Sequence, residues 1–263
     1  MTLLAPLAAD PARAAVIVDF DGTLAPIVAD PPAAAPLPEA AATLGRLARR
    51  FGRVAVVSGR PVEFLRDRLP VDGLALFGQY GVERFEGTEV TTAPAAARWA
   101  DAVRRAADEA EAELPDLFVE RKGNVAVALH WRRRPDLEAE ATDLGRRLAT
   151  AYGLRLEPGR QTLELRPQLD LDKGTAVEEI AAVASAVLFM GDDRGDLAAF
   201  DTVTRLVDEG RLTHAVRVAV RSPETPAELL ARADLAVDGP HGALELLDRL
   251  VELLDRPATE HAQ

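Results

Sequence analysis

AAVIVDFDGTL, residues 14–24, is a run of apolar and β-branched residues that ends abruptly in two carboxylates, a glycine and a threonine. This pattern predicts a buried strand that leads into a polar loop. Because residues two apart in an extended chain share a face, we expect Asp19 and Asp21 to point the same way, while Phe20 returns to apolar packing. Two carboxylates this close repel each other unless a cation lies between them, and Gly22 lets the backbone turn there. The stretch therefore predicts a magnesium site.

The composition allows a sizeable core and excludes several classes of partner. The chain has 263 residues, of which 48% are hydrophobic, enough for one large domain or two small ones. Its net charge of -12 argues against binding to nucleic acid or to an acidic membrane surface, because both require clustered Lys and Arg. The absence of cysteine excludes disulfides and thiolate chemistry. We expect a cytoplasmic monomer that acts on a small molecule, with no nucleic-acid or membrane partner.

Strand-like and helix-like segments alternate in the first and last parts of the chain. This order favours parallel strands joined by crossover helices, with polar chemistry at the carboxyl ends of the strands. The proline-rich segment 26–38 is expected to be an irregular loop. The predicted strands are 14–18, 54–57, 186–190, 215–220 and 235–237, and the predicted helices are 38–51, 61–69, 172–183 and 242–254.

The character of the chain changes in its middle part. Helical spacing of apolar residues predicts two amphipathic helices, at 96–114 and 137–151. Strand-like runs lie between and after these helices, at 117–122, 125–131 and 162–166. This pattern indicates a small α+β module inserted into the larger domain. We therefore expect an α/β fold with a doubly wound parallel-sheet core of residues 1–86 and 168–263. Residues 87–167 would form the cap, with linkers near Gly87 and Leu169.

Polar residues follow three of the predicted strands. They are Asp19-x-Asp21-Gly22-Thr23, Ser58-Gly59-Arg60 and Gly191-Asp192-Asp193-x-x-Asp196, and Lys173 opens a helix between the last two. Because parallel strands end at one edge of a sheet, distant carboxylates can share a cation there. Oxygen ligands suit a hard ion such as Mg²⁺. Each motif alone is explained by an ordinary turn or a solvated side chain, but their joint occurrence in this order is not.

The order and spacing of these motifs resemble the haloacid dehalogenase superfamily, whose members mostly hydrolyse phosphate monoesters through an aspartyl-phosphate. The resemblance implies that Asp19 is the nucleophile and that Asp21 is the general acid and then the general base. Ser58 and Lys173 would hold the phosphoryl oxygens. The implied magnesium ligands are Asp19, Asp21 through its backbone carbonyl, and Asp192. Asp193 would support the metal site and orient Lys173, with Asp196 as a further supporting residue.

The inserted module offers a polar sheet face that could bind sugar hydroxyls. Alternation places Val125, Val127, Leu129 and Trp131 on the apolar face, and His130 and Arg132 on the opposite face. Thr162, Glu164 and Arg166 also share a face. The register of the hairpin around Gly123-Asn124 stays open. A two-residue loop pairs Lys122 with Val125 on the apolar side, whereas a three-residue loop pairs Glu120 with Ala126 on the polar side. An ordinary solvated face is the alternative to a binding surface.

Motifs before and within the module narrow the resemblance to trehalose-6-phosphate phosphatases. They are Gly78-Gln79-Tyr80-Gly81-Val82-Glu83, Glu120-x-Lys122, His130-x-Arg132, Gly159-Arg160 and Glu164-x-Arg166-Pro167. The chain departs from the family where Gly195, Leu197 and Ala198 replace Thr, Glu and Asp, and where Arg160 replaces a lysine. The implied substrate-binding residues are Arg60, Glu83, Glu120, Lys122, His130, Arg132, Glu164 and Arg166.

The resulting prediction is a magnesium-dependent phosphoric monoester hydrolase that converts trehalose 6-phosphate to trehalose and phosphate. Closure of the cap would exclude bulk water and bring the cap residues to the sugar. Two alternatives remain. One is a phosphatase or mutase of the same superfamily that acts on another sugar phosphate, such as sucrose 6-phosphate or a hexose phosphate. The other is a non-catalytic sugar-phosphate sensor or regulatory subunit, which would be free to lose Asp19, Asp21, Lys173 and Asp192.

Overall fold

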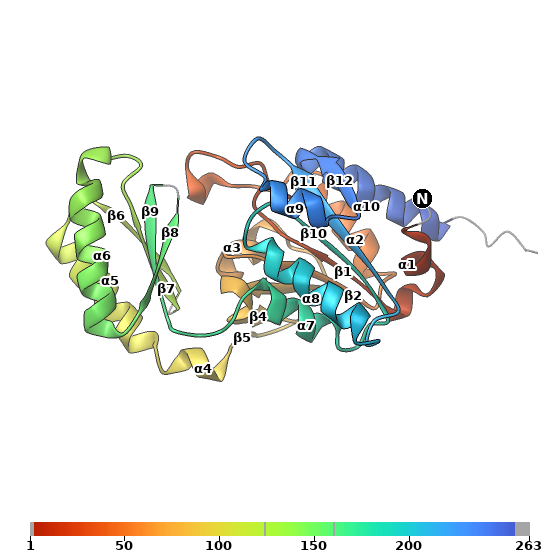
Figure 1. The fold of residues 1–263 in the computed structure, drawn as a ribbon, viewed down its shortest axis with the longest axis horizontal. Coiled ribbons are helices and arrows are strands. Elements are labelled where there is room, and N and C mark those ends of the chain that lie inside the picture. Colours follow the sequence, from red (N-terminus) through yellow and green to blue (C-terminus); the bar gives the residue numbers. More distant parts are fainter. Residues whose placement is uncertain (1–2, 124, 160, 256–263) are drawn as a thin grey trace, which may run out of the picture. The chain divides into compact units, whose positions relative to one another are not determined.

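The computed structural model describes residues 3–123, 125–159 and 161–255, and its described residues form two compact units (Figure 1). One unit contains the chain up to Val90 and from Leu171 onward, and the other runs from Thr91 to Asp170. Within the described residues, no helix has the length and apolar character needed to cross a membrane. Asn124 and Arg160, which belong to two of the sequence motifs, lie outside the described residues.

The larger unit is built on an eight-stranded sheet with the order β12-β11-β10-β1-β2-β3-β4-β5, in which the last strand, β5, begins at the final residue of this unit's first segment. The pairs from β12 to β3 are parallel, and β4 is antiparallel to β3. The strands are β1 (Ala14–Val18), β2 (Arg53–Val57), β3 (Leu74–Gly78), β4 (Glu83–Phe85), β5 (Val90–Thr92), β10 (Ala186–Gly191), β11 (His214–Arg221) and β12 (Leu235–Asp238). The prediction of a parallel-dominated sheet is confirmed.

Helices cover both faces of this sheet, which explains the uninterrupted apolar run of β1. Val16 and Val18 pack in a core cluster with α1 (Ala5–Ala9), α2 (Ala40–Ala48), α3 (Val62–Arg68) and α10 (Gly239–Asp255). Ala15 and Ile17 pack on the other side with α7 (Lys173–Ala181), α8 (Asp196–Asp208) and α9 (Ala227–Arg232). Successive residues of β1 therefore enter opposite cores, and no position on the strand can be polar until the strand ends.

The smaller unit is an antiparallel sheet of order β6-β7-β9-β8, with its helices on one face (Figure 1). Its core joins apolar residues of β7 and β9 to those of the two long helices. The elements are α4 (Pro94–Ala97), α5 (Ala100–Glu113), β6 (Phe118–Lys122), β7 (Ala126–His130), α6 (Glu138–Tyr152), β8 (Arg155–Gly159) and β9 (Thr162–Arg166). The single helix predicted for residues 96–114 is two helices, because a turn at Trp99 separates α4 from α5.

The hairpin register of β6 and β7 places Glu120 and Lys122 on the polar face. Lys122 pairs with Ala126, and Glu120 pairs with Ala128. This is the register of the longer loop, although the expected pairing of Glu120 with Ala126 was wrong by two residues. A shift of two residues keeps every side chain on the same face. Glu164 pairs with Ala128 from β9, so it shares this face as well.

Several elements were not predicted from the sequence. They are α1, β3, β4, β5, β8, α8 and α9. The proline-rich segment 26–38 contains one 3-10 turn, Pro31–Ala33, and is otherwise irregular, as expected.

Candidate active site

Three carboxylates that follow two neighbouring strands meet at the carboxyl edge of the larger sheet. Asp19 follows β1, and its backbone N–H donates to the carbonyl of Met190 on β10 at 2.9 Å. Asp192 follows β10, and Asp196 begins α8. Each of the three offers an oxygen within 4.8 Å of the others, and all three side chains are buried. The sheet register therefore brings residues 173 positions apart into one cluster.

Lys173 lies at the start of α7 and is the cation of this cluster. Its Nζ donates to Asp196 Oδ1 at 2.7 Å and lies 2.8 Å from Asp19 Oδ1. Burial alone would lower the pKa of Lys173, but the charges of Asp19 and Asp196 outweigh burial and raise this pKa well above its usual value. The ammonium group is therefore charged at every physiological pH.

Asp196 organises the loop that follows β10. Its Oδ2 accepts hydrogen bonds from the backbone N–H groups of Asp192 (2.8 Å) and Asp193 (2.9 Å). From the sequence we expected Asp193 to orient Lys173. In the structure Asp193 is the more distant partner, at 3.8 Å, and its side chain is 63% exposed. The short contact with Lys173 belongs to Asp196 because the start of α8 turns residue 196, not residue 193, inward.

The electrostatic balance of the cluster fits a divalent cation. Burial, together with the charges of Asp196 and Asp193, raises the pKa of Asp192 to about 7. Burial likewise raises the pKa of Asp196 to about 6, and it raises that of Asp19 well above its usual value against the opposing effect of Lys173. Three buried carboxylates thus face one ammonium group. The surplus negative charge and the oxygen-only donor set suit a hard ion such as Mg²⁺.

The turn after β1 packs directly against Asp192. Gly22 has a φ of +82°, and a Cβ at this position would lie 2.1 Å from Asp192 Oδ2. The Thr23 hydroxyl donates to Asp192 Oδ1 at 3.4 Å. Only glycine combines this backbone conformation with so close an approach.

Ser58 directly follows β2, the strand adjacent to β1, and lies two residues beyond the register pair of Val18 and Val56. Its side chain is buried, and its Oγ accepts the backbone N–H of Arg60 at 3.1 Å. The loop after β3 holds this segment through two backbone bonds, from Tyr80 N–H to the Ser58 carbonyl and from Gln79 N–H to the Arg60 carbonyl, both 2.9 Å. Ser58 therefore belongs to the same edge as the carboxylates.

Two residues expected to bind substrate, Arg60 and Glu83, have protein partners in the larger unit. The Arg60 guanidinium donates from Nε to Asp21 Oδ2 at 2.7 Å and from Nη2 to Asp21 Oδ1 at 2.8 Å. Glu83 accepts the backbone N–H of Val62 at 2.8 Å, at the start of α3, and burial raises the pKa of its carboxyl group.

The polar face of the smaller sheet carries a network of charged pairs. Lys122 donates to Glu164 at 2.6 Å, and His130 Nε2 lies 2.9 Å from Glu120 Oε2. The Arg166 guanidinium donates to Glu157 at 2.8 Å and approaches Glu164 at 3.7 Å. Glu157 was not singled out from the sequence, because the following Pro158 and Gly159 are untypical of a strand and the strand that carries Glu157 was not predicted. The remaining predicted residue, Arg132, is partly buried just beyond β7.

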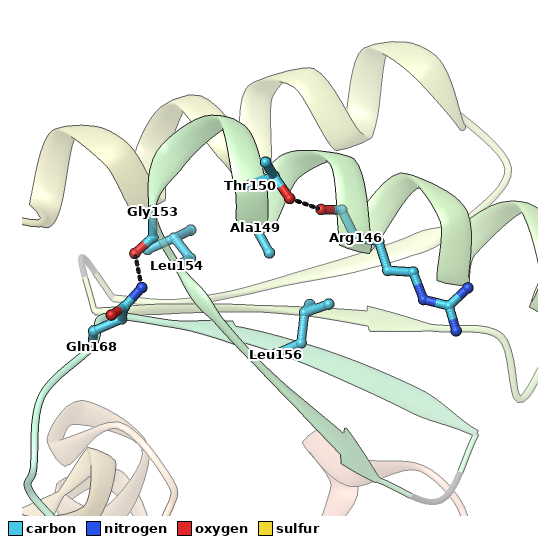
Figure 2. Close-up of a pocket in the computed structure, with 7 residues that line it drawn as sticks. All are labelled: Arg146, Ala149, Thr150, Gly153, Leu154, Leu156 and Gln168. Carbon is cyan, nitrogen blue, oxygen red and sulfur yellow. Dashed lines mark hydrogen bonds between the residues drawn. The ribbon is translucent and has the colours of Figure 1, made fainter.

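A pocket of about 400 Å³ also lies in the smaller unit, beside α6 and β8 (Figure 2). Its polar groups are partly used internally, since Gln168 donates to the Gly153 carbonyl at 3.0 Å and Thr150 donates to the Arg146 carbonyl at 3.0 Å. None of the predicted site residues lines it. The candidate site is therefore placed at the carboxylate edge rather than in this pocket.

Comparison with known proteins identifies the family. The trehalose-phosphatase family model matches residues 17–232. The chain belongs to this family. The predicted family is thereby confirmed. A curated member, the trehalose-phosphate phosphatase of Mycobacterium avium, is 36% identical over 255 residues, which cover 92% of this chain and 63% of that protein. The chain thus spans somewhat less than two thirds of this relative.

Solved structures show the same fold for this trehalose-phosphatase family chain. The C-terminal domain of Candida albicans trehalose-6-phosphate phosphatase is 22% identical, with a TM-score of 0.73 over 95% of this chain and 96% of that one. A haloacid dehalogenase-like hydrolase from Bacteroides thetaiotaomicron is 17% identical, with a TM-score of 0.58 over 90% of this chain and 98% of that one. The fold is therefore haloacid dehalogenase-like, as predicted.

Proposed function

We propose that this chain is a magnesium-dependent phosphatase that hydrolyses trehalose 6-phosphate to trehalose and phosphate. The observation that carries the proposal is the buried Asp19, held by Lys173 at 2.8 Å beside two further buried carboxylates. A fixed carboxylate next to a permanent cation is what a nucleophile for phosphoryl transfer requires. Family membership and the M. avium relative support the choice of substrate.

Asp19, Asp192 and the backbone carbonyl of Asp21 would hold the Mg²⁺. The bound ion would supply positive charge that lets a phosphate dianion approach a carboxylate. Asp196 is also within reach of the other carboxylates, but its two oxygens already accept from Lys173 and from two backbone N–H groups. We therefore assign Asp196 to the support of the site rather than to the metal.

The reaction takes two steps at phosphorus. An Asp19 oxygen forms a bond to phosphorus while the bond from phosphorus to the sugar oxygen breaks, and that oxygen keeps the electron pair and receives a proton from Asp21. In the second step a water oxygen attacks phosphorus, Asp21 takes the proton, and the bond from phosphorus to Asp19 breaks. Lys173 and Ser58 would hold the phosphoryl oxygens in both steps.

The smaller unit is assigned to recognition of the sugar. Its polar face carries donors and acceptors side by side, in the pairs Lys122–Glu164, His130–Glu120 and Arg166–Glu157, and sugar hydroxyls need both. The Glu164 carboxylate supports this assignment, because its Oε1 is buried and has no hydrogen-bond partner among the described residues. Glu120, Lys122, His130, Arg132, Glu164 and Arg166 are the residues proposed to bind it.

Phosphate release from a panel of sugar phosphates tests the proposal. With Mg²⁺, we expect the highest kcat/KM for trehalose 6-phosphate, loss of activity in EDTA, and recovery when Mg²⁺ is returned. Asp19→Asn should abolish turnover without changing the thermal unfolding midpoint by more than a few degrees. Efficient cleavage of sucrose 6-phosphate or glucose 6-phosphate, with none of trehalose 6-phosphate, would show that the substrate is wrong. Tight binding without turnover would favour a sensor.

A further inference from the structure

We infer that Arg60 is a positioning residue that aims the carboxylate of Asp21, and that it does not bind the substrate. The inference rests on the proposed function, because Asp21 acts there as proton donor and acceptor. Arg60 contacts both Asp21 oxygens, through Nε at 2.7 Å and Nη2 at 2.8 Å. Such a two-pronged contact fixes the plane of a carboxylate as well as its position, which a single hydrogen bond cannot do.

The guanidinium of Arg60 is itself held by two contacts besides those to Asp21. Its Nη1 donates to the carbonyl of Pro31 at 2.9 Å, and its Cζ lies 4.6 Å from the centre of the Phe64 ring. The backbone N–H and carbonyl of Arg60 are bonded to Ser58 and Gln79. Because both the backbone and the tip of this long side chain are anchored, and only 14% of the side chain is exposed, Arg60 forms a fixed support rather than a mobile arm.

Asp21 needs such a support because it is less enclosed than the other carboxylates. Its side chain is 30% exposed, whereas that of Asp19 is 4% exposed. A carboxylate that must pass a proton to the leaving oxygen, and later take one from water, requires a fixed orientation relative to phosphorus. Misplacement of a catalytic group by about 1 Å can reduce the rate about 100-fold. Loss of the Arg60 support should therefore slow the steps that depend on Asp21.

Arg68 provides a matched control for the inference. Its Cζ lies 3.5 Å from the centre of the same Phe64 ring, and it donates to the carbonyls of Ala34 and Pro32, both at 2.7 Å. Arg68 thus holds the same proline-rich loop that Arg60 contacts through Pro31. A variant of Arg68 weakens the loop without removing the bidentate contact to Asp21.

The experiment uses p-nitrophenyl phosphate with Mg²⁺, because nitrophenolate leaves without a proton. Asp21 is then required only for the second step. For Arg60→Gln we expect a burst of one nitrophenolate per chain at a rate within about threefold of the parent, followed by a steady rate at least about tenfold slower. Arg68→Gln should keep the steady rate within about threefold. Arg60→Lys keeps the positive charge but cannot make the two-pronged contact, so its steady rate should lie between those of the parent and of Arg60→Gln. This variant also covers the case in which Arg60→Gln does not fold.

A double variant separates positioning from substrate binding. In an Asp21→Ala background, Arg60→Gln should change neither the burst nor the steady rate by more than about twofold, because its target is gone. A burst rate that falls about tenfold in both backgrounds would assign Arg60 to the phosphoryl group and overturn the inference. Equal slowing by Arg68→Gln would assign the effect to the loop and overturn it as well. Failure of the proposed function is distinguished by the parent chain, which would then release no phosphate from trehalose 6-phosphate.

Discussion

Replacing Lys173 with methionine should destabilise the larger unit strongly in the absence of metal. The variant keeps the length of the side chain but removes the cation that lies 2.7 Å from Asp196 and 2.8 Å from Asp19. Removing one partner of a buried ion pair costs about 3–5 kcal/mol, because the other charge stays buried without compensation. With a change of about 2–4 °C per kcal/mol for a unit of this size, the unfolding midpoint should fall by about 6–20 °C.

Thermal unfolding followed by circular dichroism in EDTA at pH 7.5 measures this effect. Arg205→Met is the matched control, since Arg205 also pairs with two carboxylates, Glu178 at 2.7 Å and Glu209 at 3.1 Å, but its side chain is 44% exposed. An exposed pair contributes about 0–1 kcal/mol, so the control should lose less than about 4 °C. Equal shifts for the two variants, or a shift below about 3 °C for Lys173→Met, would refute the argument that burial gives the Lys173 pairs their strength.

Three further predictions concern the carboxylates, the turn and the sugar site. In EDTA the free energy of unfolding should fall as pH rises from 5 to 8. The folded chain raises the pKa values of Asp196 and Asp192 to about 6 and about 7, so below these values it binds more protons than the unfolded chain does. Bound Mg²⁺ should weaken or reverse this trend. Gly22→Ala should lower Mg²⁺ affinity at least about tenfold, since its Cβ would lie 2.1 Å from Asp192 Oδ2. The same variant should lower the free energy of unfolding by about 1–2 kcal/mol, because alanine is strained at the positive φ of this position. Glu164→Gln should raise KM for trehalose 6-phosphate at least about ten times more than KM for p-nitrophenyl phosphate, because the smaller ester has no sugar to bind.

Each of these has an outcome that contradicts it. A metal-free stability that rises between pH 5 and 8 would show that the raised pKa values are wrong in sign. Unchanged Mg²⁺ affinity in titration calorimetry of Gly22→Ala would remove Asp192 from the metal site. Parallel changes in KM for the two esters would show that Glu164 supports the fold of the smaller unit rather than contacts with the sugar.

The general plan of the fold and the meeting of Asp19, Lys173 and Asp192 could be predicted from the sequence. Both follow from local rules, since β1 has an apolar run long enough to be buried on two faces and parallel strands end at one edge of a sheet. The strand β8 could not be found in this way. Its Pro158 and Gly159 are typical of turns, and only pairing with β9 keeps them in a strand.

Side-chain partners were harder to predict than strand ends. The choice between Asp193 and Asp196 as the close partner of Lys173 depends on where α8 begins, which is set by tertiary packing. The target of Arg60 was missed because a long, flexible side chain reaches several positions, and the sequence does not show that Asp21 lies on the neighbouring strand end at the right distance.

The central position of β1 has a consequence for the order in which the chain can fold. This strand pairs with β2 on one side and with β10 on the other, and β10 begins at Ala186. The smaller unit is continuous from Thr91 to Asp170, so all the strands of its own sheet leave the ribosome before β10 does. The strand β1, which leads directly into Asp19, therefore has one edge unpaired while the smaller unit is synthesised and can already fold. A chain that stops before residue 186 would combine a completed small unit with an open sheet edge, which is a template for aggregation.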